Sequence, residues 1–129
     1  MVCSTDKFNV PLSPYDHIDY LYDWSDFLTN EEAATDEEID SFLLVLPQEA
    51  IDAGLLKDNE TIIDIVKTVD GVEVTYPNAG VKVWFQINAS DQDNAAWKAP
   101  GLQYAIRCKI TTTSGRVKNK SPKLRVKRD

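Results

Sequence analysis

The chain has 129 residues, of which 43% are hydrophobic and 27% are charged. This composition is typical of one globular domain and excludes a disordered segment. No apolar run approaches the roughly 18 residues that a membrane helix needs. The first residues lack the basic start and apolar middle of a signal peptide. We therefore expect one domain that folds in the cytoplasm.

Charge is distributed unevenly along the chain. The formal net charge is −7, but residues 1–70 hold seventeen Asp and Glu against three Lys, whereas residues 71–129 hold four against eleven Lys and Arg. The last twenty-six residues alone contain nine of the fourteen cations. If both halves fold together, the domain carries an acidic side and a basic side, and such a surface can dock head-to-tail against a copy of itself.

The first segments predict an N-terminal arm followed by a strand. Residues 1–16 contain Pro11 and Pro14 and show no sustained hydrophobic period, so we expect an extended arm. Residues 17–24 alternate between polar and apolar positions, which is typical of a half-buried strand. Its expected core face is formed by Ile18, Tyr20, Tyr22 and Trp24.

The next segments alternate between acidic and apolar composition. Residues 25–40 are dense in carboxylates and predict a solvated connection, with a short helical turn as the alternative. Residues 41–47 predict a buried strand that Pro47 ends. Residues 48–56 predict one or two helical turns that end at Gly54, the residue type that commonly closes a helix.

The middle of the chain predicts a hairpin and a further strand. Residues 61–69 and 71–77 are rich in β-branched residues and meet at Asp70-Gly71, a strong signal for a tight turn. Residues 80–89 predict a separate strand whose apolar positions alternate with polar ones. Trp84 falls on the outward face of this strand.

The last third predicts a loop and two more strands. Residues 90–101 read as a loop, and residues 102–113 as the longest strand of the chain. A turn at 114–115 leads into residues 116–127, where the apolar phase changes and Pro122 marks a break. About seven strands with frequent turns give an all-β chain, and a β-sandwich is favoured over a barrel.

Few residues in the sequence are suited to catalysis or metal binding. His17 is the one histidine, and Cys3 and Cys108 read as two free thiols. Asp91 and Asp93 begin like a calcium loop, but the glycine and glutamate that such a loop needs later are missing. We therefore expect no enzyme activity, no metal and no cofactor. A divalent ion in the acidic segment and a glycosidase-type carboxylate pair remain alternatives.

The basic C-terminal strands are the main candidate for a binding surface. We interpret them as a face that docks against an acidic protein neighbour; a solvated face and a nucleic-acid contact are the alternatives. Nucleic acid is disfavoured because residues 105–129 lack interleaved aromatic residues for base stacking. The candidate interface residues are Arg107, Lys109, Arg116, Lys118, Lys123, Arg125 and Lys127. The expected acidic counter-face is formed by Glu31, Glu32, Asp36, Glu37 and Glu38.

Two tryptophans extend this candidate surface. An outward Trp84 is expected to mark an interface, because a large aromatic side chain is costly to leave in water. Cover by the N-terminal arm is the alternative. Trp97, in the predicted loop, is the second interface candidate.

Two stretches of the chain resemble a known family. "IDYLYDWSDFL" at 18–28 resembles the opening strand of small tailed-phage structural proteins known as fiber–tail adaptors. The closing strand pair of that family is matched by Tyr104, Ile106, Ile110, Thr111, Thr112, Gly115, Arg116, Lys120, Ser121, Leu124, Arg125 and Val126. The chain departs from the pattern in its acidic insertion at 29–40, its longer 47–60 stretch, and Lys120 where the family has arginine.

The resemblance implies an immunoglobulin-like sandwich, with an arm at 1–16 and the sandwich at 17–129. It implies a non-enzymatic virion protein of the tail or neck, docking between portal or tail proteins and tail fibers. It also implies a homo-oligomeric ring in the particle, without membrane or nucleic-acid partners. The alternatives are a head-decoration protein and a carbohydrate-binding accessory module.

Overall fold

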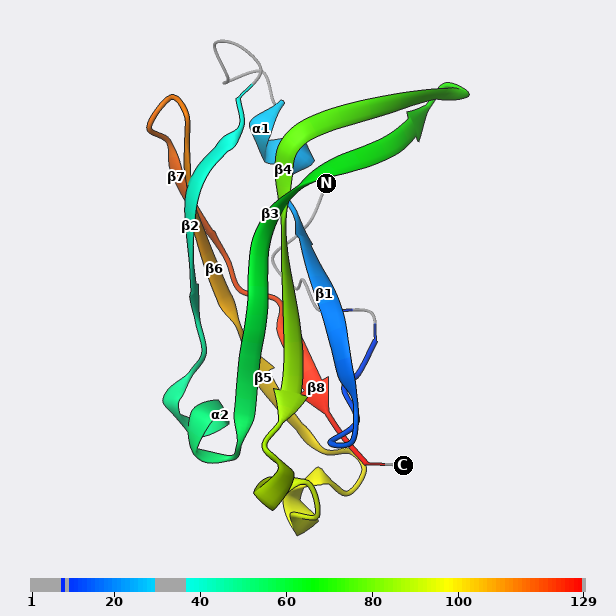
Figure 1. Cartoon of the computed structure of the whole chain (residues 1–129), viewed down its shortest axis with the longest axis vertical. Coiled ribbons are helices and arrows are strands. Elements are labelled where there is room, and N and C mark those ends of the chain that lie inside the picture. Colours follow the sequence, from blue (N-terminus) through cyan, green and yellow to red (C-terminus); the bar gives the residue numbers. More distant parts are fainter. Residues whose placement is uncertain (1–7, 9, 30–36, 129) are drawn as a thin grey trace.

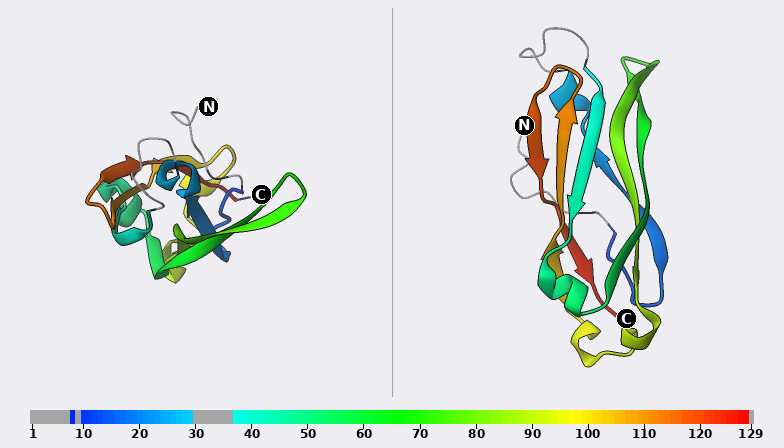
Figure 2. Two further views of the ribbon diagram at one scale, coloured as in Figure 1. Left: turned by 90° about the horizontal axis from the view of Figure 1, so that it is seen from above. Right: turned by 60° about the vertical axis from the view of Figure 1, so that its left-hand side comes forward.

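The computed structural model describes residues 8, 10–29 and 37–128, and these form an antiparallel β-sandwich of two layers (Figures 1 and 2). Short helical segments connect the strands at the ends of the layers. The elements are β1 (His17–Asp23), α1 (Ser25–Leu28), β2 (Ile39–Val45), α2 (Gln48–Asp52), β3 (Leu55–Val69), β4 (Val72–Ile87), the 3-10 helices η1 (Ala89–Asp91) and η2 (Ala95–Trp97), β5 (Leu102–Ala105), β6 (Arg107–Thr112), β7 (Val117–Lys120) and β8 (Lys123–Val126). The sequence-based expectation of an all-β sandwich is confirmed.

The first layer is a sheet with the order β1-β4-β3, in which β4 is central. The predicted alternation of β1 is confirmed: Tyr20 and Tyr22 are buried between the layers, and Asp19 and Leu21 face outward. The hydroxyl of Tyr22 donates to the carbonyl of Ile106 in the other layer, at 2.7 Å. This bond satisfies a buried polar group and ties the two layers together.

The second layer combines the sheets β2-β6-β7 and β5-β8. The expected single strand at 102–113 is interrupted at Ile106, so it forms β5 and β6 rather than the longest strand. The partner strand breaks at Pro122, as predicted, and the amide of Ile106 donates to the Pro122 carbonyl at 3.0 Å. The two breaks therefore lie opposite each other, and the layer continues across them.

The N-terminal segment belongs to this second layer. The amide of Leu12 donates to the Arg125 carbonyl, and the amide of Lys127 donates to the Leu12 carbonyl, which makes a parallel bridge to β8. Leu12 is fully buried, and the Phe8 ring lies 4.9 Å from the ring of Tyr20. The expectation of a separate arm is therefore wrong for these described residues, which pack against the chain's own core.

The longest elements are β3 and β4, which form one hairpin. The predicted tight turn is confirmed, because Asp70 and Gly71 both have positive φ, at 52° and 78°. The expected separate strands at 71–77 and 80–89 are one strand, β4. Figure 1 shows that the far half of this hairpin bends away from the sandwich and projects beyond it. We call this half, residues 64–77, the ribbon.

The bend of the hairpin depends on Gly80. The pairing register shifts between Ile63 and Ile65, and a Cβ placed on Gly80 would lie 2.6 Å from the Ile65 side chain and 3.1 Å from that of Leu21. The missing side chain therefore makes room for Ile65 to pack over the sheet. Beyond the bend, Lys67 holds the ribbon to the body through an ion pair with Asp23 at 3.3 Å.

The predicted placement of Cys108 in the core is confirmed. Its side chain is fully buried on β6, and burial raises the pKa of the thiol to about 12. The predicted helical turns at 48–56 are also found, as α2, and Gly54 follows them with a φ of 107°. Among the described residues, no helix is long and apolar enough to cross a membrane.

Candidate interaction surfaces

Side chains alternate between the inner and outer sides of each strand in the second layer, and most of the predicted cations lie on the outer side. Cys108 and Ile110 are buried in β6, so their neighbours Arg107 and Lys109 point outward. Leu124 in β8 is buried in the same way. We define the basic face by the five cations that share this outward side: Arg107, Lys109, Lys123, Arg125 and Lys127.

The basic face has an unbalanced charge. None of its five cations forms an ion pair with a described residue; Arg125 donates instead to the Pro100 carbonyl at 2.5 Å. Among the described residues of these strands, Asp40 is an exposed carboxylate, at the irregular start of β2. The face also exposes Leu43 and Val117, which are 54% and 52% accessible. Cations around exposed aliphatic side chains suit a docking surface better than a fully solvated one.

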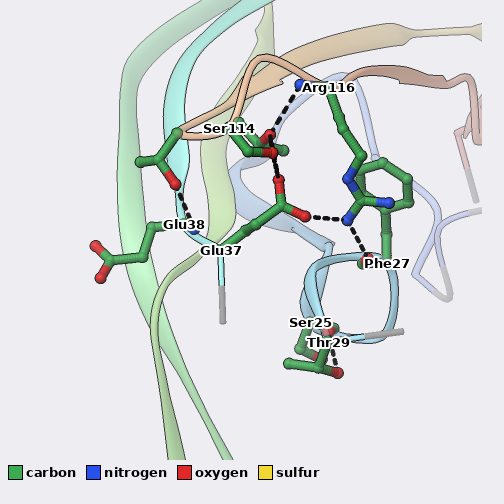
Figure 3. Close-up of polar contacts among 9 residues, drawn as sticks. Ser25, Phe27, Thr29, Glu37, Glu38, Ser114 and Arg116 are labelled. Carbon is green, nitrogen blue, oxygen red and sulfur yellow. Dashed lines mark hydrogen bonds and ion pairs between the residues drawn. The ribbon is translucent and has the colours of Figure 1, made fainter. Parts of the chain in front are cut away.

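Arg116 does not belong to this face, although the sequence placed it there. It lies at the start of β7 and turns toward α1, where its guanidinium stacks on the Phe27 ring with the central carbon 4.2 Å from the centroid. It also donates to the Phe27 carbonyl at 3.0 Å and forms an ion pair with Glu37 (Figure 3). The guanidinium of Arg116 therefore makes contacts within the chain, and the prediction that Arg116 is an interface residue is wrong.

Lys118 also departs from the predicted face. It pairs with the buried Ile110, so it lies on the other side of β7 from the outward residue Asn119. The next residue with this orientation, Lys120, lies over the ring of Trp24 with its nitrogen 4.8 Å from the centroid and donates to the Asp23 carbonyl. The expected surface therefore loses Lys118, because strand alternation turns it away from the basic face.

Glu37 was expected on an acidic counter-face but is 5% exposed. Figure 3 shows its carboxylate between Ser114 and Arg116. Thr112 donates a hydroxyl hydrogen bond to it at 2.6 Å, and Ser114 donates a second. The hydrogen bonds from Arg116, Ser114 and Thr112 hold the pKa of Glu37 at about 2.

We call the group formed by Phe27, Glu37, Thr112, Ser114 and Arg116 the clasp. It joins α1, the start of β2 and the turn between β6 and β7. Beside it, a cleft of about 300 Å³ separates the end of α1 from the root of the ribbon. Because every polar member of the clasp contacts another member, its role is to fix the chain rather than to bind a partner.

The expected acidic counter-face is thus not a single described surface. Glu31, Glu32 and Asp36 lie outside the described residues. Glu38 is partly buried and accepts a hydrogen bond from the Asn78 side chain at 2.6 Å. The prediction is wrong for Glu37, because Arg116 and two hydroxyl groups hold its carboxylate inside the clasp.

The outer face of the first layer presents a different combination of residues. Trp84 lies outward on β4, between Asp19 of β1 and Asp58 of β3 in the pairing register. Its ring lies 5.2 Å from the His17 ring, and His17 is within 3.1 Å of Asp58. We call this surface the acid–tryptophan face; it is formed by His17, Asp19, Leu21, Leu56, Asp58, Lys82, Trp84 and Gln86.

Trp84 is half-buried on this face, and Phe8, a described residue of the N-terminal segment, does not cover it; residues 1–7 and 9 lie outside the described residues. Phe8 packs on the opposite, inner side of the sheet, within 6.3 Å of the Phe85 ring. The interface role of Trp84 remains a prediction. Leu21 and Leu56 lie near it and are each 44% exposed. Aromatic and aliphatic side chains inside a polar rim are typical of a protein interface.

Trp97 is not an interface residue, which corrects the second aromatic prediction. Its side chain is 0% exposed, and its indole nitrogen donates to the Asp91 carbonyl at 2.8 Å. The expected loop at 90–101 contains the turns η1 and η2, capped by the side chains of Asn88 and Asn94. The compact turns bury the ring and close one end of the sandwich.

No group of three His, Cys, Asp or Glu side chains suited to a metal ion occurs in the part of the chain that the structure describes. Comparison of the chain with protein-family models, with curated proteins and with solved structures finds no match. The two outer faces and the two sequence motifs are the features of this chain that bear on its function.

Proposed function

We propose that the chain is a non-enzymatic bacteriophage virion protein of the fiber–tail adaptor type. In this role it joins portal or tail proteins to tail fibers through its charged and aromatic outer faces. The observation that carries the proposal is the basic face: five cations without an ion pair to a described residue, on a chain whose net charge is −7. A surface with this charge favours association with an acidic protein partner.

The two motifs that carry the resemblance lie in contact in the fold. The opening motif forms β1 and α1, and the closing motif forms β5 to β8. They contact each other at Tyr22 with Ile106, at Trp24 with Lys120, and at Phe27 with Arg116. Residues about ninety positions apart thus form one packed unit. The shared pattern favours a common fold, and the adaptor role follows from it by analogy.

The carbohydrate-binding alternative loses its main support. A carbohydrate-binding face would need several exposed aromatic side chains, such as Trp84, Trp97 and Tyr76, and Trp97 is fully buried. The head-decoration alternative uses the same kind of outer face and differs in copy number. No residue of the described chain favours one virion position over the other, so particle composition separates them.

The test is quantitative mass spectrometry of purified phage particles, with the portal and major capsid proteins as internal standards. The proposal predicts a copy number comparable to that of the portal. A copy number comparable to that of the capsid protein would favour the decoration alternative. Complete absence from particles would overturn the virion proposal.

A further inference from the structure

The two outer faces of the sandwich point in opposite directions and differ in charge. The basic face lies on the second layer and the acid–tryptophan face on the first, with the core between them (Figure 2). Each face exposes two large aliphatic side chains, Leu43 and Val117 on one and Leu21 and Leu56 on the other. Each therefore combines apolar area with charged groups, and the two sets of charges have opposite sign.

We propose that the basic face of one copy docks on the acid–tryptophan face of the next copy. This inference rests on the proposed assembly function and names its partner as a second copy of this chain. In the docked pair, Trp84 and its leucine neighbours meet Leu43 and Val117, and Asp19 and Asp58 approach the lysines and arginines.

Charge complementarity favours a second copy as the occupant. The five cations of the basic face carry +5, whereas Asp19, Asp58 and Lys82 give the acid–tryptophan face a net charge of −1. Within the acid–tryptophan face, Lys82 lies only 3.9 Å from Asp19, and His17 contacts Asp58. Each aspartate is between a third and a half exposed, so its oxygens remain accessible to a cation from outside. Lys82 and His17 therefore already orient the carboxylates of Asp19 and Asp58, and the docking contact would bring cations of the next copy to these carboxylates.

The two faces are different surfaces, so their contact is heterologous. The docked pair then retains one free acid–tryptophan face, on the first copy, and one free basic face, on the second. Such an arrangement closes into a ring when the rotation between copies allows it and otherwise extends as a filament. A symmetric dimer, by contrast, would use one surface twice and would leave the other face unoccupied.

The experiment uses two charge-reversal variants of the full chain. The first, Arg107→Glu with Lys109→Glu and Lys123→Glu, reverses the charge of the basic face from +5 to −1. The second, Asp19→Lys with Asp58→Lys, reverses the acid–tryptophan face. Circular dichroism and thermal unfolding establish that both variants fold. If the second variant fails to fold, Trp84→Ala replaces it, with loss of self-association as the expected result.

Self-association is measured by sedimentation at about 0.1 mM protein, a concentration at which a standard-size interface of micromolar affinity is occupied. The wild-type chain should self-associate, and each variant alone should associate at least about tenfold more weakly. An equal mixture of the two variants should associate again, because one carries two acidic faces and the other two basic faces. Wild-type association should weaken as salt rises from about 0.1 M to about 1 M, where the Debye length falls from about 10 Å to about 3 Å.

A wild-type chain that stays monomeric would overturn the inference. So would association that both reversals leave unchanged, or a mixture of variants that fails to associate. If the wild-type chain is monomeric but is counted in particles at portal-like copy number, this inference fails and the proposed function stands. Binding of wild-type protein to duplex DNA through the basic face, without self-association, would also overturn it.

Discussion

The cations near the C-terminus divide between two regions of the molecule. In the clasp region, Arg116 stacks on Phe27 and Lys120 lies over Trp24, and both contact main-chain carbonyls of the first thirty residues. On the basic face, by contrast, Lys109 and Lys123 are exposed and have no ion pair with a described residue. Cations only a few positions apart in the sequence thus either stabilise the fold through internal contacts or lie exposed on the outer face.

The difference teaches that strand orientation and neighbouring elements, rather than charge, decide the role of each cation. Lys120 pairs with the buried Cys108, so it lies on the inner side of β7 and meets Trp24. Lys109 is next to Cys108 in the chain and points the opposite way. Removal of an inward-facing partner should therefore affect stability, whereas removal of an outward-facing one should affect association alone.

The largest expected effect separates a tryptophan of the core, Trp24, from a tryptophan of an outer face, Trp84. Trp24 is 2% exposed, so Trp24→Ala should lower the free energy of unfolding by about 3–5 kcal/mol. Trp84→Ala, on the acid–tryptophan face, is the matched control and should lower the free energy of unfolding by much less. Urea unfolding of the isolated variants measures both values. Equal losses would contradict the division between inner and outer side chains.

The next effect compares two cations. Arg116→Ala leaves the buried Glu37 without its ion-pair partner, and the melting temperature should fall by at least about 4 °C. Lys109→Ala removes an exposed side chain and should change the melting temperature by about 1 °C or less. Thermal unfolding followed by circular dichroism checks both variants. A fall for Lys109→Ala as large as that for Arg116→Ala would refute the comparison.

The clasp should also give a pH dependence. The pKa of Glu37 is about 2 in the folded chain, below its usual value near 4.3, so its ionised form stabilises the fold. This contribution is present in full well above pH 4.3 and is lost as the pH falls toward 2. At pH 7, the urea concentration at the midpoint of unfolding should therefore be higher for the wild-type chain than for Glu37→Gln. The difference between the two midpoints should narrow as the pH falls from 5 to 2. A difference in midpoint that stays constant over this pH interval would show that the charge of the Glu37 carboxylate does not stabilise the fold.

The smallest effect concerns Lys120. Lys120→Met keeps much of the aliphatic chain but removes the charge over Trp24 and the hydrogen bond to the Asp23 carbonyl, and we expect a loss of about 1 kcal/mol. Lys118→Met, on the same strand, is exposed and serves as the control. Urea unfolding again supplies the measurement. If Lys118→Met costs as much as Lys120→Met, the contact with Trp24 contributes nothing specific.

Local pattern was enough to predict the elements of the fold. Alternation in 17–24 identified the core face of β1, and Asp70-Gly71 identified the turn of the long hairpin. Because side chains alternate along a strand, an inward Cys108 also predicted that Arg107 and Lys109 point outward. These features depend on a few neighbouring residues, so the sequence alone contains them.

The parts that sequence reasoning missed depend on contacts between distant residues. Glu37 meets Ser114 across 77 positions, and no local pattern distinguishes it from the other carboxylates of its acidic segment. Trp97 is buried because the 3-10 turns around it fold back, although a loop tryptophan reads as exposed. The sequence signal for the compact turns at 88–98 is the pair of capping residues Asn88 and Asn94.

The most direct measurement of the central claim is a lysine-labelling footprint, comparing isolated protein with protein in purified particles. An amine-reactive reagent and mass spectrometry report the accessibility of each lysine. The docking account predicts that Lys109 and Lys123 lose reactivity in the particle, while Lys98, exposed in the loop at the end of the sandwich, keeps it. Unchanged reactivity of Lys109 and Lys123 in assembled protein would contradict the claim that the basic face is a docking surface.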